Sequence, residues 1–213
     1  MNKQKLTKVA ILLMIVFSFS GFFLLLGKNT NLASITLIIG IVCYFITSET
    51  KEREDMSLKM IPDLLKDAKL DILILMPILM NVICYAFAKM FLPEFLEHLL
   101  ERIGFLSFNQ IIVLIIELMI AALGEEIAWR GFFQNRLSKW LPFSLALFIT
   151  AGLFSFCHFS IGSLHIVLYD FIFIIINAIF YGLIYKKSNN IIICTISHFF
   201  ANVVGILGLF LII

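Results

Sequence analysis

Long apolar runs are the feature that most constrains how this chain of 213 residues can fold. A hydrocarbon layer about 30 Å thick requires about 20 apolar residues of helix, at about 1.5 Å per residue. Runs close to that length cover residues 9–26, 32–47, 70–91, 111–137, 141–159, 165–185 and 191–213. The sequence therefore predicts an all-α, polytopic transmembrane helical bundle of about seven spans. The fourth run is long, so we expect it to extend past the membrane or to break near Gly131.

Composition excludes two classes of protein. Apolar residues make up 62% of the chain and charged residues 14%, proportions that do not suit a water-soluble domain. The net charge of +2 is too small to indicate nucleic acid as a partner. The sequence has no repeat and no long linker, so we expect residues 1–213 to form a single membrane domain. No cleavage signature of small residues follows the first run, which we interpret as a retained span.

The segment 93–104 differs in pattern from the spans. Its apolar residues are Phe95, Leu96, Leu99, Leu100 and Ile103, and its charged or polar residues are Glu94, Glu97, His98, Glu101 and Arg102. At helical spacing these two sets lie on opposite sides, as is typical of an amphipathic helix lying in the membrane interface. We therefore expect His98 to be solvated. The charged segment 48–69 is expected to be a solvated, partly helical loop.

Basic residues predict the orientation, because cytoplasmic loops carry an excess of Lys and Arg. In a seven-span arrangement one side holds Lys3, Lys5, Lys8, Lys51, Arg53, Lys59, Lys66, Lys69, Arg136, Lys139, Lys186 and Lys187. The other side holds Lys28, Lys89 and Arg102. This bias predicts a cytoplasmic N-terminus and an external C-terminus. The abundance of Ile, Lys and Asn favours a bacterial source and hence a plasma membrane.

Ionisable residues within spans are costly in lipid, so each one is a functional candidate. The last four spans contain Glu117, Glu125, Glu126, Arg130, His158, Asp170 and His198, with the polar Asn177 and Asn202. The first two spans contain no charge, so we expect them mainly to face lipid and the last four to enclose a site. His165 and Asp170 begin the sixth span and are expected at the interface. Glu117 either lines the entrance of the site or faces a neighbouring helix.

The spacing of these residues assigns them to helix faces. Glu126 and Arg130 lie four residues apart, so they can form an ion pair within one helix. Glu125 is turned by about 100° from Glu126 and needs a different partner. The pairs Phe154 and His158, and His198 and Asn202, have the same four-residue spacing. Each of three helices thus presents a short polar stripe.

Two chemistries fit a glutamate and two histidines in a low-dielectric cavity. A carboxylate and an imidazole can share the proton of a water molecule, while a second histidine with an asparagine can stabilise an oxyanion. Alternatively, Glu125, His158 and His198 can bind Zn²⁺ with one open position. The residues alone leave open whether the cofactor is Zn²⁺ or none.

The segments that begin at Glu125, Phe154 and His198 resemble, in order, the motifs EExxxR, FxxxH and HxxxN. This chain is similar over about residues 111–202 to the CAAX-protease and bacteriocin-processing family of intramembrane endopeptidases, also called Abi proteins. The resemblance implies that Glu125 activates water with His158, and that His198 and Asn202 stabilise the oxyanion. Glu126 and Arg130 would support the site. Family members are described as glutamate-dependent and as metal-dependent.

We therefore expect an intramembrane endopeptidase that hydrolyses a hydrophobic peptide or membrane protein, in bacteriocin self-immunity or peptide maturation. A proton-coupled transporter is the first alternative, because Glu and His within spans also form proton relays. Against it, the sequence has no inverted repeat and no pair of broken helices. The second alternative is a non-catalytic immunity or scaffold protein.

Overall fold

The computed structural model describes residues 2–21, 33–49, 52–104 and 110–212, and in these residues the secondary structure is helical without strands. The main helices are α1 (Lys3–Ser18), α2 (Ala33–Thr47), α4 (Ala68–Phe91), α5 (Glu94–Ile103), α6 (Ile111–Glu126), α8 (Phe143–Cys157), α9 (Leu164–Ser188) and α10 (Ile191–Ile212). The shorter pieces are η2 (Glu52–Met56), η3 (Leu58–Met60), α3 (Ile61–Leu64), the π-helical η4 (Ile127–Gln134) and α7 (Asn135–Leu137). The predicted all-α fold class is confirmed.

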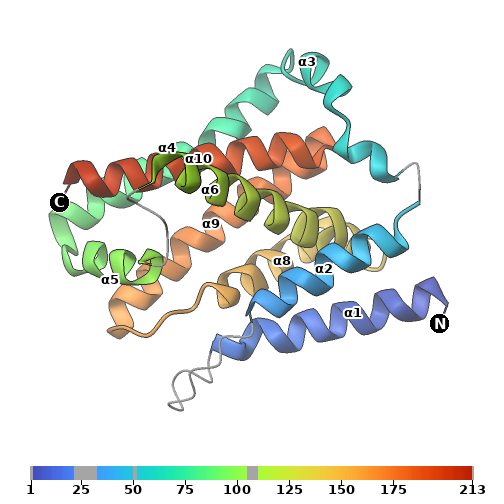
Figure 1. Ribbon diagram of the computed structural model, residues 1–213, viewed down its shortest axis with the longest axis horizontal. Coiled ribbons are helices and arrows are strands. Elements are labelled where there is room, and N and C mark those ends of the chain that lie inside the picture. Colours follow the sequence, from blue (N-terminus) through green and yellow to red (C-terminus); the bar gives the residue numbers. More distant parts are fainter. Residues whose placement is uncertain (1, 22–32, 50–51, 105–109, 213) are drawn as a thin grey trace.

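Each predicted apolar run contains a helix. Residues 141–142 and 158–159 lie outside α8, and residues 22–26, 32 and 213 lie outside the described part. Four helices are long and apolar enough to cross a membrane: Lys3–Gly21, Ala68–Phe91, Leu164–Ser188 and Ile191–Phe210. The apolar helices Ala33–Thr47 and Phe143–Cys157 are shorter. Long apolar helices with exposed side chains over much of their surface indicate an integral membrane protein. The helices pack side by side along most of their length (Figure 1).

The fourth run does not break near Gly131, which was the second of its two expected alternatives. α6 continues into η4 and α7, and η4 has the wider turns of a π-helix, a form that is frequent at functional sites. A Cβ atom at Gly131 would lie 2.6 Å from Ile191 Cδ1 and 3.1 Å from Tyr44 Cε2. The absence of a side chain at Gly131 therefore allows η4 to pack closely against α2 and α10.

The first two helices do more than face lipid, which corrects the expectation from their lack of charge. α2 packs against η4, and a Cβ atom at Gly40 would lie 2.6 Å from Ala128 Cβ. α1 packs against α2 and α8 and buries Met14 completely. The opposite faces of both helices remain apolar and exposed, for example at Leu12 and Val42. Each helix therefore packs against the rest of the bundle with one face only.

The loop between α2 and α4 is anchored in the bundle rather than fully solvated. Asp55, at 1% exposure, accepts hydrogen bonds from Tyr44 at 2.5 Å and from Tyr185 at 2.8 Å. These bonds join α2, η2 and α9 at one end of the molecule.

α5 is a helix as predicted, but its surroundings differ from the prediction. Phe95 and Leu99 are buried, and α5 packs against α4 and α9. His98 is also buried, with its Nε2 atom 2.9 Å from the hydroxyl of Ser160. The prediction that His98 is solvated is therefore wrong, because the α8–α9 loop covers it.

Candidate active site

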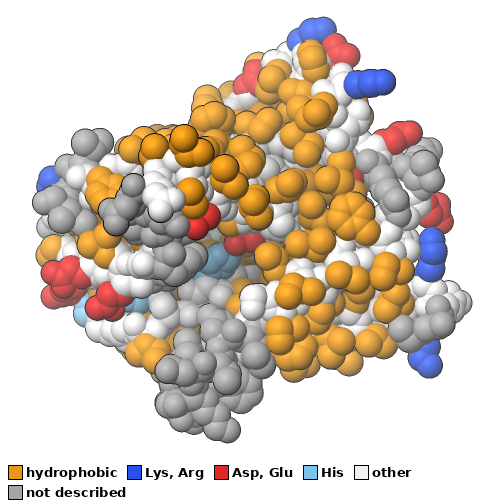
Figure 2. Space-filling model, in the orientation of Figure 1, with side chains coloured by type: hydrophobic (Ala, Val, Ile, Leu, Met, Phe, Trp, Pro, Cys, Tyr) orange, Lys and Arg blue, Asp and Glu red, His pale blue; other side chains and the backbone are white. Residues whose placement is uncertain are grey.

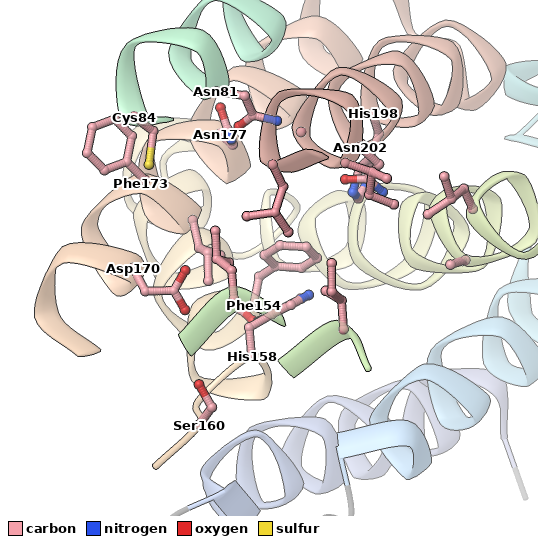
Figure 3. A pocket seen from close by; sticks show the side chains of 18 of the residues that line it. Asn81, Cys84, Phe154, His158, Ser160, Asp170, Phe173, Asn177, His198 and Asn202 are labelled. Carbon is pink, nitrogen blue, oxygen red and sulfur yellow. Dashed lines mark hydrogen bonds between the residues drawn. The ribbon is translucent and has the colours of Figure 1, made fainter. Parts of the chain in front are cut away.

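A cavity of about 740 Å³ lies between α4, α5, α6, α8, α9 and α10. Most of its wall is apolar, and its polar residues include Asn81, Glu117, His158, Ser160, Asp170, Asn177, Tyr181, His198 and Asn202. Figure 3 shows several of these side chains around the cavity. In the space-filling view, histidine and acidic side chains are visible in the middle of the apolar face (Figure 2). Polar groups therefore gather within an otherwise apolar region.

Glu125 lies between two imidazole rings at the end of α6. Its Oε1 atom is 3.9 Å from His158 Nε2, and its Oε2 atom is 3.7 Å from His198 Nε2. The Glu125 side chain is 21% exposed, so water can reach it. His158 follows directly after α8, and His198 lies on α10. The structure thus brings together three predicted site residues from three helices.

The second nitrogen of each imidazole is already engaged. His158 Nδ1 lies 2.9 Å from the carbonyl oxygen of Phe154, which can only accept, so Nδ1 carries the proton of the neutral ring. His198 Nδ1 lies 2.8 Å from Glu126 Oε1, a carboxylate oxygen that is also paired with Arg130. Both rings therefore face Glu125 with their Nε2 atoms, which accept a hydrogen bond in the neutral ring and donate one in the imidazolium form. A water molecule can both donate and accept, so it suits the space between these nitrogens and the carboxylate.

The predicted ion pair of Glu126 and Arg130 is present and fully buried. Arg130 Nη1 donates to Glu126 Oε1 at 3.1 Å, and Arg130 Nη2 donates to the Ala178 carbonyl at 3.0 Å. A buried ion pair needs such additional hydrogen bonds to offset the cost of removing both charges from water. Because Glu126 Oε1 also contacts His198, this pair orients a site histidine as well as joining α6 to η4.

Two aromatic rings hold Arg130 and His198 in place. The guanidinium lies 4.8 Å from the ring centroid of Phe154 and 5.2 Å from that of Tyr181. Tyr181 also stacks on the imidazole of His198, with the ring centroids 4.4 Å apart and the planes at 18°. The FxxxH motif includes Phe154, whereas sequence reasoning missed Tyr181. The four-residue spacing of Asn177, Tyr181 and Tyr185 was the available signal, because it places their polar groups on one face of α9.

Asn202 lines the same cavity as His158 and His198. It lies one turn after His198 on α10, and its amide has no hydrogen-bond partner in the described part of the chain. The amide is therefore available to a bound molecule. Asn81 and Asn177 also line this cavity, and Asn81 donates a hydrogen bond to the carbonyl of Ala201, the residue before Asn202. Asn81 was not among the predicted site residues.

The remaining ionisable candidates have different positions. Glu117 lines the cavity, which agrees with the first of its two predicted roles. Asp170 was expected at the interface but is buried and also lines the cavity. His165 is exposed, as expected for a helix end, and lies 3.5 Å from Glu94.

The spacing of the three central residues lies between the values for a shared zinc ion and for a shared water molecule, because two acceptors bonded to one water lie about 4.5 Å apart. Two ligands of a tetrahedral zinc with bonds near 2.0 Å lie about 3.3 Å apart. The distances of 3.9 and 3.7 Å from Glu125 to the two histidines are longer. Within the described residues, no group of three or more His, Cys, Asp or Glu side chains is placed to hold a metal ion.

Comparison with known proteins identifies the region that contains these residues. The family model described as type II CAAX prenyl endopeptidase Rce1-like matches residues 107–204. This range includes Glu125, His158, His198 and Asn202 and excludes α1, α2 and α4. Neither the curated proteins nor the solved structures gave a significant match.

Proposed function

Because residues 107–204 form an Rce1-like domain of the CAAX-protease and bacteriocin-processing family, which implies a peptidase, we propose that the chain is an intramembrane endopeptidase with Glu125 at its catalytic centre. One observation carries the proposal: the Glu125 carboxylate lies between the Nε2 atoms of His158 and His198. Both rings are held by bonds to their Nδ1 atoms. This arrangement favours a water molecule bound to the Glu125 carboxylate where its side chain is exposed, between the two Nε2 atoms.

In the proposed reaction, Glu125 and His158 remove a proton from this water as its oxygen attacks the carbonyl carbon of the scissile peptide bond. Burial in a low-dielectric cavity strengthens the interaction of the carboxylate with the water proton. Proton transfer in the reverse direction then delivers the proton to the departing amine nitrogen. The products are a new carboxyl terminus and a new amino terminus.

His198 and Asn202 are the proposed stabilising residues for the tetrahedral intermediate. The amide of Asn202 and the Nε2–H group of a protonated His198 can donate to the oxyanion. The Arg130 and Glu126 pair keeps the imidazole of His198 in a fixed orientation. Phe154 and Tyr181 restrict the same ring from two further sides. A fixed set of donors needs little reorganisation when negative charge develops on the substrate oxygen.

The proposed substrate is a hydrophobic peptide or a segment of a membrane protein. The cavity wall is mainly apolar, and none of the described residues that line it is Lys or Arg. The helices around it expose long apolar side chains such as Ile112, Ile120 and Leu168, which favours substrate arrival from the lipid.

The proposed orientation has the N-terminus in the cytoplasm and the C-terminus outside. The two ends of the chain lie at opposite ends of the bundle, which supports an odd number of crossings (Figure 1). Most of the visible Lys and Arg side chains lie toward the end that carries the N-terminus (Figure 2). Reporters fused after Lys69 or Lys187 are expected to be cytoplasmic, and a reporter fused after Ile213 external. A cytoplasmic C-terminus would contradict this orientation.

The peptidase proposal is tested by comparing membrane peptides from cells that express the wild type or Glu125→Gln. Glutamine has nearly the same shape as glutamate but cannot accept the water proton. We expect peptides with new termini in the wild type only. Identical sets of peptides in the two strains would favour a non-catalytic protein.

A further inference from the structure

Two asparagines from α4 and α9 form a bonded pair in the cavity wall. Asn177 Nδ2 donates to Asn81 Oδ1 at 2.8 Å, and Asn81 Nδ2 donates to the carbonyl of Ala201 at 2.7 Å. Figure 3 shows the pair side by side, with Asn202 on the neighbouring helix. Since Asn81 precedes residue 107, a helix outside the matched family region contributes to this wall.

The pair keeps unused hydrogen-bonding capacity. An asparagine amide has two N–H donors and a carbonyl acceptor. The two bonds above use one N–H of each amide and the carbonyl of Asn81. One N–H of each residue remains, and the buried Oδ1 atom of Asn177 has no partner among the described residues. Around the pair the wall is largely apolar, with Cys84, Ile174 and Leu209 among its residues.

A peptide substrate creates a need for such groups. A bond can be hydrolysed only when the substrate backbone around it is extended enough for water to attack. An extended segment in an apolar environment loses the hydrogen bonds of its helix, and each unpaired N–H or C=O then costs several kcal/mol. Neutral amides can satisfy both backbone groups, and they do so without reading any substrate side chain.

We propose that Asn81 and Asn177 form a docking site for the backbone of an extended peptide segment beside Asn202. The proposal rests on the proposed peptidase function and specifies what that site recognises: the main chain of an unwound apolar peptide. Asn177 Oδ1 accepts a backbone N–H of the segment, and the remaining amide hydrogens donate to its carbonyl groups.

A purely packing role predicts something different. The bond from Asn81 to Ala201 already joins α4 to α10, and Asn177 adds only a bond to Asn81. If packing were the sole role, an apolar residue of similar shape at position 177 would lower the stability of the protein, because Asn81 Oδ1 loses its donor, but it would not change how the binding of a peptide depends on one backbone N–H.

The test measures binding to purified protein that carries Glu125→Gln in detergent, so that cleavage is not required. The probe is a fluorescent ten-residue peptide of alternating Leu and Ala. In a series of analogues, one backbone N–H at a time is replaced by an ester oxygen, with all side chains kept. We expect one analogue to bind about 2- to 10-fold more weakly than the parent peptide, the effect of one net hydrogen bond. With Asn177→Leu added, that difference should disappear.

Two additional variants make the result decisive. Asn177→Ala removes the same amide without adding volume and should behave as Asn177→Leu does. Asn135→Leu removes an amide outside the cavity, one that donates to Tyr185, and should retain the ester effect. The docking site would be overturned if the ester substitution weakened peptide binding by the same factor with and without Asn177. It would also be overturned if the parent peptide did not bind. If the ester effect is found but the wild type cleaves nothing, the peptidase proposal fails and the docking site stands.

Discussion

Glu126 accepts a hydrogen bond from His198 Nδ1 at 2.8 Å, which connects the first and last of the three sequence motifs directly. The same oxygen atom is 3.1 Å from Arg130. Glu126 therefore fixes which nitrogen of His198 faces Glu125. Glu126, which was expected to pair with Arg130 and to support the site, thus orients a proposed site residue.

Glu126→Gln is expected to destabilise the protein strongly. The substitution leaves the charge of Arg130 buried without a counter-charge, and breaking a buried pair in this way costs about 3–5 kcal/mol. The measurement is the free energy of unfolding in detergent. The double variant Glu126→Gln with Arg130→Met removes both charges and should recover part of the loss. Unchanged stability of the single variant would contradict the assigned role of the pair.

Tyr181→Leu should lower kcat while leaving KM nearly unchanged, because the ring orients His198 and does not need to contact the substrate. A small misalignment of a site residue gives about a 10-fold loss or more. The measurement uses a peptide that spans a cleavage site found by comparing the wild type with Glu125→Gln. Tyr181→Phe keeps the ring and should remain active.

The matched control is Tyr169→Leu, the same substitution on the same helix. Tyr169 packs against Phe95 and Phe173 and does not contact His198. Equal loss of kcat in Tyr169→Leu and Tyr181→Leu would show that the effect comes from helix packing and not from the stacked ring.

Gly40→Ala tests whether α2 supports the site region. The added Cβ would lie 2.6 Å from Ala128 Cβ and 2.8 Å from Ala128 Cα, so the two helices must separate. Overpacking of this kind costs about 1–3 kcal/mol. Gly152→Ala is the control, since nothing lies within 4 Å of its new Cβ, and it should be neutral or stabilising. Unfolding in detergent measures both, and equal stabilities would contradict the close contact of α2 and η4.

Composition and spacing predicted the features that depend on local sequence. The apolar runs predicted the helices, and the four-residue spacing predicted the contact of Glu126 with Arg130. The order of the motifs indicated which helices meet. The burial of a residue by segments far away in the sequence was not predictable in this way. His98 resembled an interfacial residue because α5 is amphipathic, and Asp170 did so because it lies near the start of its span. The burial of both depends on contacts with other segments.

Tyr181 and Asn81 were missed for a related reason. A tyrosine or an asparagine in an apolar helix has many structural uses, so only the position of the neighbouring helix shows that it reaches the site. Tyr181 stacks on a residue of α10, and Asn81 bonds to the backbone of that helix. The spacing of Asn177, Tyr181 and Tyr185 indicates a shared helix face but not which helix that face contacts.

Chelation and Asn202→Ala distinguish the two candidate chemistries. In the metal-free mechanism, activity persists after metal is stripped, and Asn202→Ala lowers kcat by about 100-fold or more with nearly unchanged KM, as expected for an oxyanion donor. If His158 and His198 hold zinc, chelation stops turnover and added zinc restores it. Rescue of Asn202→Ala by zinc would contradict the oxyanion role.

The central claim is that a water molecule activated at Glu125 hydrolyses a peptide bond, and isotope incorporation tests it most directly. Purified wild type and Glu125→Gln are each incubated with solubilised membrane proteins in water enriched in ¹⁸O, and the peptides are analysed by mass spectrometry. Hydrolysis places one ¹⁸O atom in each new carboxyl terminus. We predict such labelled termini with the wild type and none above background with Glu125→Gln. Equal numbers of labelled termini with both proteins would contradict the account.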